Sequence, residues 1–71
     1  MTASEWLAAY AQRLGVPAPA PEDVEAVLAL AGVAAHASER VAAPVACWLA
    51  AQAGVALGEA LELAREVGED A

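Results

Sequence analysis

The sequence predicts an all-α fold, a compact bundle of four short helices that forms a single domain over residues 1–71. Apolar residues recur at helical spacing in four segments, whereas no segment alternates between apolar and polar residues as a strand does. Helix-capping residues, prolines and glycines separate these segments. The expected helices cover residues 3–14, 22–37, 44–53 and 57–67.

The first helix opens with "TASE", in which Thr2 caps the backbone and Glu5 reaches back to it. Gly15 is expected to end this helix, because glycine adopts the left-handed conformation of a C-terminal cap without strain. The stiff, extended connector "VPAPAP" follows and sets the spacing to the next helix. The apolar stripe of the first helix consists of Trp6, Leu7, Tyr10 and Leu14.

The second helix starts near Pro21, and the acids among residues 22–25 suit the positive end of its dipole. It is expected to end between His36 and Ser38. Its core stripe consists of Val24, Val27, Leu28, Ala31 and Ala35.

The third helix is expected to start at Pro44, since proline is favoured in the first turn. One of its faces carries Val45, Trp48, Leu49 and Gln52. Small residues recur at every fourth position along another line, at Ala42, Ala46, Ala50, Gly54 and Gly58. Such a ladder of small residues lets another helix approach closely.

The fourth helix runs from Leu57 to Val67, with Leu57, Leu61, Ala64 and Val67 directed inward. Gly54 is expected to separate it from the third helix. A single bent helix over both segments is the alternative that the sequence leaves open.

The apolar composition predicts a thin core. Of the residues counted as hydrophobic, 22 are alanine, and the chain has neither Phe nor Ile. Alanine adds little buried area, and a chain of 71 residues is marginally stable alone. We therefore expect a partner surface, either a second copy or another protein, to supply the missing burial.

The charge excludes two classes of partner. Ten acidic residues face three arginines, there is no lysine, and the net charge is −7. A protein that binds nucleic acid needs a basic face for the phosphates, and a protein that binds an anionic membrane surface needs one for the same reason. The acids cluster at residues 22–25 and 59–70, as a solvated face or as a docking patch for a basic partner.

The sequence favours a cytoplasmic protein that does not span a membrane. Residues 41–58 are free of charge for the minimum length of a membrane helix, but Pro44, Gln52 and two glycines interrupt them. A buried helix and turn fit this segment better. The single cysteine, Cys47, permits no internal disulfide, and the N-terminus does not resemble a signal peptide.

The segment "AHASERVAAP", residues 35–44, holds the candidate corner or interface residues His36, Arg40 and Pro44, and Trp48 follows one turn later. We expect His36 and Arg40 to satisfy the last carbonyls of the second helix, and Pro44 to fix the start of the third. Arg40 is alternatively an outward interface anchor. Trp48 is expected in the core, with an interface hot spot as its alternative.

No catalytic, cofactor or metal site is predicted. A zinc site needs three or four ligands, and the chain has one histidine and one cysteine. Nucleophilic catalysis by Cys47 with His36 as its base is conceivable, because a turn separates the two, but no third orienting residue is evident. The sequence therefore indicates a protein that is not an enzyme.

The stretch "LALAGVAAHASERVAAPVACWLAAQAG", residues 28–54, resembles the central part of a small bacterial domain family of unknown function. The resemblance rests on Ala-His at the end of a helix, then Arg40, then Ala-Ala-Pro opening a helix that closes on Gly54. The N-terminal "EWLAAYAQRLGV" is similar to the first helix of that family. Val41 departs from the pattern, which has a proline after the arginine.

The resemblance implies a pathway. Members of that family occur alone or fused to MobA-like nucleotidyltransferases of molybdopterin-guanine dinucleotide synthesis, often near formate dehydrogenase accessory genes. The implied role is an accessory or interaction module that binds a molybdoenzyme or a protein of molybdenum-cofactor maturation. A self-associating structural helical subunit without a cofactor link is the alternative hypothesis, and a small enzyme using His36 and Cys47 is the weakest.

Overall fold

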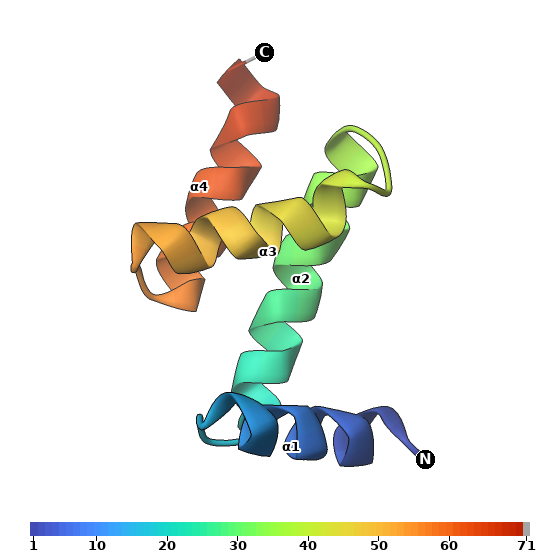
Figure 1. Cartoon of the computed structure of the whole chain (residues 1–71). Coiled ribbons are helices and arrows are strands. Elements are labelled where there is room, and N and C mark those ends of the chain that lie inside the picture. Colours follow the sequence, from blue (N-terminus) through green and yellow to red (C-terminus); the bar gives the residue numbers. More distant parts are fainter. Residues whose placement is uncertain (71) are drawn as a thin grey trace.

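Four helices make up the fold, as expected from the sequence (Figure 1). The computed structural model describes the backbone of residues 1–70 and the side chains of residues 1–67. The described backbone contains no strand, which confirms the all-α fold class. The helices are α1 (Ala3–Leu14), α2 (Pro21–Ala37), α3 (Ala42–Ala53) and α4 (Leu57–Asp70).

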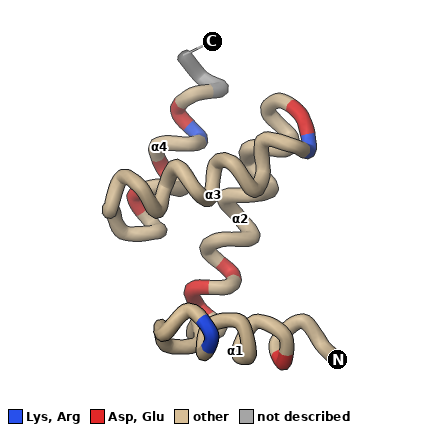
Figure 2. Tube along the Cα trace, in the orientation of Figure 1, with Lys and Arg blue, Asp and Glu red and all other residues tan. Residues whose placement is uncertain are grey.

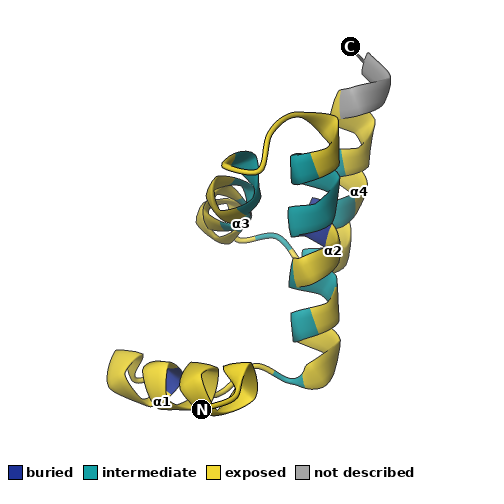
Figure 3. Cartoon of the chain, turned by 90° about the vertical axis from the view of Figure 1, so that its right-hand side faces the viewer, coloured by how far each residue is buried: buried dark blue, intermediate teal, exposed yellow. Residues whose placement is uncertain are grey.

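The long helix α2 is the element on which the others are arranged. Both α3 and α4 pack against it: α3 crosses α2 at a steep angle, and α4 runs alongside it (Figures 1 and 3). Helix α1 lies across the N-terminal end of α2, apart from α3 and α4. The molecule is therefore elongated along α2, with extents of 39 × 23 × 18 Å.

The ends of α1 are closed by the residues that the sequence indicates. Thr2 and Glu5 form a reciprocal capping box, with Thr2 N donating to Glu5 Oε1 at 2.8 Å and Glu5 N donating to Thr2 Oγ1 at 3.1 Å. At the other end Gly15 has φ 78°, and Val16 N donates to Ala11 O at 3.0 Å. Gly15 N also donates to Gln12 O, at 3.1 Å. This glycine cap with two backbone hydrogen bonds ends the helix at Leu14.

Helix α3 begins two residues before the expected position. It starts at Ala42 rather than at Pro44, so the proline stands third in the helix. The first N–H groups of a helix have no acceptor within it, so a proline is tolerated anywhere in that turn. At the other end Gly54 has φ 70° and caps α3, which settles the open question: α3 and α4 are separate helices.

The central packing joins α2 to α4. Leu30 of α2 and Ala60 of α4 are buried. Leu57, Leu61 and Ala64 of α4 are half-buried, as expected for its inward face. The core is small because the alanine that fills it has little side chain to bury.

Two residues assigned to the core by helical spacing lie on the surface. Leu28 of α2 is 65% exposed, because α3 and α4 cover other sides of this helix. Val67 of α4 is 68% exposed. The stripe on α2 is otherwise half-buried, at Val24, Val27, Ala31 and Ala35.

The small-residue ladder is confirmed only where α3 meets α2. Ala42, Ala46 and Ala50 are half-buried. Gly54 and Gly58 are exposed, and a methyl group added to either would meet no atom within 4 Å. The ladder therefore serves close packing over α3 alone, because the chain turns away at Gly54.

Candidate functional site

The candidate functional site is an apolar surface, since most large apolar side chains of this chain are not buried. Among residues 1–67, only Ala11, Leu30 and Ala60 are buried (Figure 3). Large apolar side chains on all four helices are exposed. Single exposed apolar residues are ordinary, but groups of them mark interaction surfaces.

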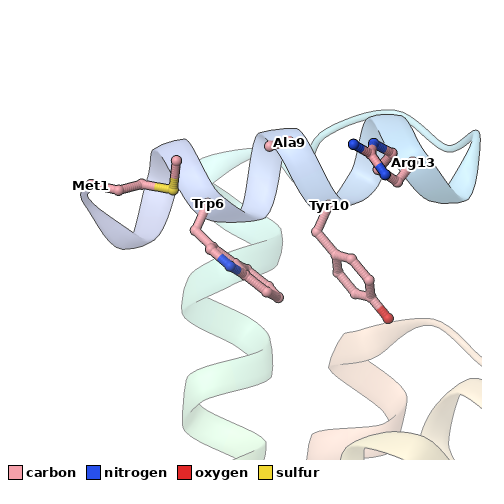
Figure 4. Close-up of a pocket in the computed structure, with 5 residues that line it drawn as sticks. All are labelled: Met1, Trp6, Ala9, Tyr10 and Arg13. Atoms are coloured by element: carbon pink, nitrogen blue, oxygen red, sulfur yellow. The ribbon is translucent and has the colours of Figure 1, made fainter.

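Helix α1 displays two aromatic side chains. Trp6 and Tyr10 stand one turn apart, with ring centroids 5.0 Å apart and ring planes tilted by 33°. Both rings point to the side of α1 on which the rest of the molecule lies (Figure 4). Together with Met1 and Arg13 they line an open groove of 280 Å³. Both residues are about half exposed, so neither is a core residue.

A second groove lies where α1 meets α2, and we name it the α1–α2 groove. It has a volume of 310 Å³, room for one or two large side chains. The connector of residues 15–20 holds the two helices in this relation, because its alternating prolines keep it extended. The lining residues are Leu7, Pro19, Asp23, Val24, Val27 and Leu28.

A smaller hollow extends the α1–α2 groove along α1. It has a volume of 130 Å³ and shares Leu7, Pro19 and Val24 with the groove. The continuous surface matches the kind of groove that receives the apolar face of a partner helix.

Acidic residues lie on the α2 side of this surface. Asp23 lines the groove itself, and Glu22 and Glu25 are exposed in the first turns of α2, where Figure 2 shows acidic segments. On α1, the hydrogen bonds from the Thr2 backbone and hydroxyl lower the pKa of Glu5, so its carboxylate stays charged at lower pH. The rim therefore favours a partner that carries basic residues next to its apolar anchors.

The outer side of α3 is a third apolar surface. Trp48, expected in the core, is 60% exposed, so that expectation is wrong. Pro44 is exposed on the same helix, one turn before Trp48. The reason is that α3 turns its small residues toward α2 and its large ones outward. Of the sequence candidates, these two share a face, as i and i+4 positions do.

Ser38 holds the corner between α2 and α3 in the role expected of His36 and Arg40. Its N and Oγ both donate to Ala34 O, at 3.2 Å and 2.8 Å. His36 and Arg40 are exposed, and neither side chain makes a hydrogen bond or ion pair with residues 1–67. The corner is thus held locally, by a serine and the backbone.

The geometry does not bring Cys47 and His36 together. The thiol of Cys47 is half-buried against α2, with its Sγ 3.9 Å from Val27 O. Val27 precedes His36 by nine residues, which is about 13 Å along a helix. In the described part of the chain, no three His, Cys, Asp or Glu side chains gather to hold a metal ion.

Sequence reasoning missed the α1–α2 groove. Leu7 and Leu28 belong to stripes that were identified, but both were treated as packing residues. The prolines of the connector were the available signal, since a stiff spacer keeps two apolar stripes from closing on each other.

No helix of the described residues is both long and apolar enough to cross a membrane. The acidic residues Glu69 and Asp70 lie outside the described side chains.

Comparison with known protein families gives a match over the full length of the chain. The family is described as "Domain of unknown function (DUF6457)", and it covers residues 1–71. No curated protein and no solved structure matches. Neither a bacterial source nor a fusion to a nucleotidyltransferase follows from this match.

Proposed function

The chain belongs to the DUF6457 family of domains of unknown function, and from this premise we propose that it is a non-catalytic protein-interaction module. The observation that carries the proposal is the α1–α2 groove. Its volume of 310 Å³ is lined almost wholly by apolar side chains, with Asp23 as the one acidic group. A groove of this kind suits the anchors of an amphipathic helix.

The rim indicates which partner helix would bind. Glu22, Asp23 and Glu25 bring three negative charges to the N-terminal turns of α2, whereas Arg13 is the single Lys or Arg before Arg40. A partner helix with Lys or Arg beside its apolar anchors would be steered toward the groove. A purely acidic partner would be repelled.

The proposed partner is a molybdoenzyme such as formate dehydrogenase, or a protein of molybdenum-cofactor maturation. This part of the proposal is supported by the resemblance of residues 28–54 and of the first helix to a family found alone or fused to MobA-like nucleotidyltransferases. The proposed location is the cytoplasm, which the single cysteine supports.

Affinity capture from the cells of origin tests this proposal. The bait is the whole chain, and the variant Leu28→Asp places a charge in the groove at a residue that is already 65% exposed. The control Leu63→Asp makes the same change on α4 at another exposed leucine outside the groove. We expect the parent and the control to recover a molybdoenzyme or maturation protein, and Leu28→Asp to lose it.

Two outcomes of this capture decide different parts of the proposal. Recovery of partners unrelated to molybdenum, lost in Leu28→Asp, would keep the groove and overturn the pathway. Equal recovery by all three baits would overturn the groove as the docking site.

A self-associating helical subunit without a cofactor link is the second candidate function, and the exposed outer side of α3 favours it. A small enzyme that uses His36 and Cys47 is the weakest candidate, because Cys47 lies against Val27, nine residues before His36 along α2. Full biological activity of the double variant His36→Ala, Cys47→Ser would dispose of that enzyme.

A further inference from the structure

The large apolar residues of α3 point away from the rest of the chain, so a monomer leaves them exposed. We define this face as Val41, Val45, Trp48 and Leu49, each of which is more than half exposed. Val41 is the N-cap residue of α3. Apart from the neighbours Trp48 and Leu49, these positions are separated by three, four, seven or eight residues, so they lie toward one side of the helix. The small residues of α3 occupy the opposite side, against α2. An ordinary surface helix has the reverse arrangement.

Helix α3 is also without charge. Residues 41–58 contain no Asp, Glu, Lys or Arg, and α3 is uniformly uncharged in Figure 2. Gln52 is the one long polar side chain of α3, and a helix that is otherwise apolar on all sides is typically covered on all sides. Helix α2 covers one side, so the outer face requires a second covering surface.

The exposed area of the chain is sufficient for such an interface. The accessible surface is 5489 Å², whereas a folded monomer of 7.1 kDa exposes about 4,100 Å². The excess, about 1,400 Å², is larger than the roughly 800 Å² that each partner buries in a standard interface. The chain as a whole therefore leaves enough area uncovered for one standard interface, and the outer face of α3 is one part of that area.

We propose that the outer face of α3 forms a two-fold interface with a second copy of this chain. A two-fold interface places the same patch of both copies face to face, so the charges of the patch must not repel those of its copy. With a net charge of −7, two copies repel each other wherever their acids meet. The other three helices carry acids, whereas α3 carries none, so two copies can meet at α3 without burying like charges.

Trp48 is the central residue of this interface. It lies midway along α3, and a large aromatic ring at the centre of an interface contributes most to association. Leu49 and Val45 flank it, so that each Trp48 would contact apolar side chains of the other copy. The interface is independent of the α1–α2 groove, which stays free for the partner proposed above.

Sedimentation of the whole chain over a range of concentrations up to high micromolar tests the proposal. We expect the parent to sediment as a dimer and Trp48→Glu as a monomer at the same concentration. The control Trp6→Glu makes the same change at the similarly exposed tryptophan of α1, and we expect it to remain a dimer. A monomeric parent at high micromolar concentration overturns the proposal, and so does a Trp48→Glu variant that stays dimeric.

Cross-linking of the parent fold covers the case in which Trp48→Glu fails to fold. In a Cys47→Ser background, Val45→Cys places a thiol on the outer face, and Leu63→Cys places one on α4. We expect oxidation to join two Val45→Cys chains much faster than two Leu63→Cys chains. Equal rates would overturn the interface. Loss of dimerisation with retained partner capture would leave the function proposed for the α1–α2 groove intact.

Discussion

Glu5 is a residue whose charge stabilises a helix that has little other support. Its carboxylate accepts a hydrogen bond from Thr2 N at 2.8 Å, and this bond lowers the pKa of Glu5. A carboxyl group with a lower pKa in the folded state stabilises that state above its unfolded pKa and loses this effect as the pH falls through the folded value.

We therefore expect acidification below pH 4.5, the usual value for Glu, to cost the parent more helicity than the variant Glu5→Gln. Circular dichroism of the two proteins along the same pH series measures the difference. Above this range the parent should be the more helical of the two. Parallel curves at all pH values would show that the charge of Glu5 does not hold α1.

Ser38 and Arg40 are expected to differ in their effect on stability. Ser38 Oγ donates to Ala34 O at 2.8 Å, so Ser38→Ala should lower the free energy of unfolding by about 1 kcal/mol. Arg40 is exposed and makes no bond to the described residues, so Arg40→Ala should change it by less than about 0.5 kcal/mol. Thermal melts of both variants check this, and a larger loss for Arg40→Ala would reverse the assignment.

At the scale of residues, the capping residues could be predicted and the corner residues could not. Thr2, Glu5 and Gly15 act through their own backbone neighbourhood, so a short motif is enough to identify them. His36 and Arg40 were expected to reach the end of α2 because they are cations. Ser38 stands four residues after Ala34, one helical turn on, so its short side chain reaches the Ala34 carbonyl.

At the scale of elements, two glycines should respond in opposite directions to alanine. Gly54 has φ 70° at the end of α3, so Gly54→Ala should lower the free energy of unfolding by about 1–2 kcal/mol. Gly32 lies within α2, and a methyl group there meets no atom within 4 Å, so Gly32→Ala should raise it by about 0.5–1 kcal/mol. Chemical denaturation of both variants measures the two changes.

A loss of stability in Gly32→Ala would contradict the expectation for α2. That loss would mean that another surface lies closer to α2 than the single chain shows. Gly54→Ala serves as the control for the assay, since its strain arises from the backbone conformation alone.

The helices themselves could be predicted, but not the faces that they bury. Prolines and glycines mark where each helix begins and ends, so the bounds agree within three residues. In α3 the rule that large apolar residues point inward fails. Helices that pack through alanine approach closely and leave no room for Trp48 between them, so the large side chains lie outside.

At the scale of the whole molecule, three helices share one small core and α1 stands apart from α3 and α4 (Figures 1 and 3). Alanine-rich sequence predicts a thin core, and the structure has only three buried residues within residues 1–67. The relation of α1 to the other helices depends on the proline connector, whose direction no periodic pattern encodes. The central claim is that the apolar outer surface of this chain is covered by another protein chain, with the second copy at α3.

The melting temperature of the parent at two protein concentrations about a hundredfold apart tests this claim most directly. A partner copy that binds only the folded chain adds to its stability in proportion to the logarithm of concentration. For a chain of this size the account predicts a rise of several degrees at the higher concentration, and no rise for Trp48→Glu. An equal melting temperature of the parent at both concentrations would contradict it.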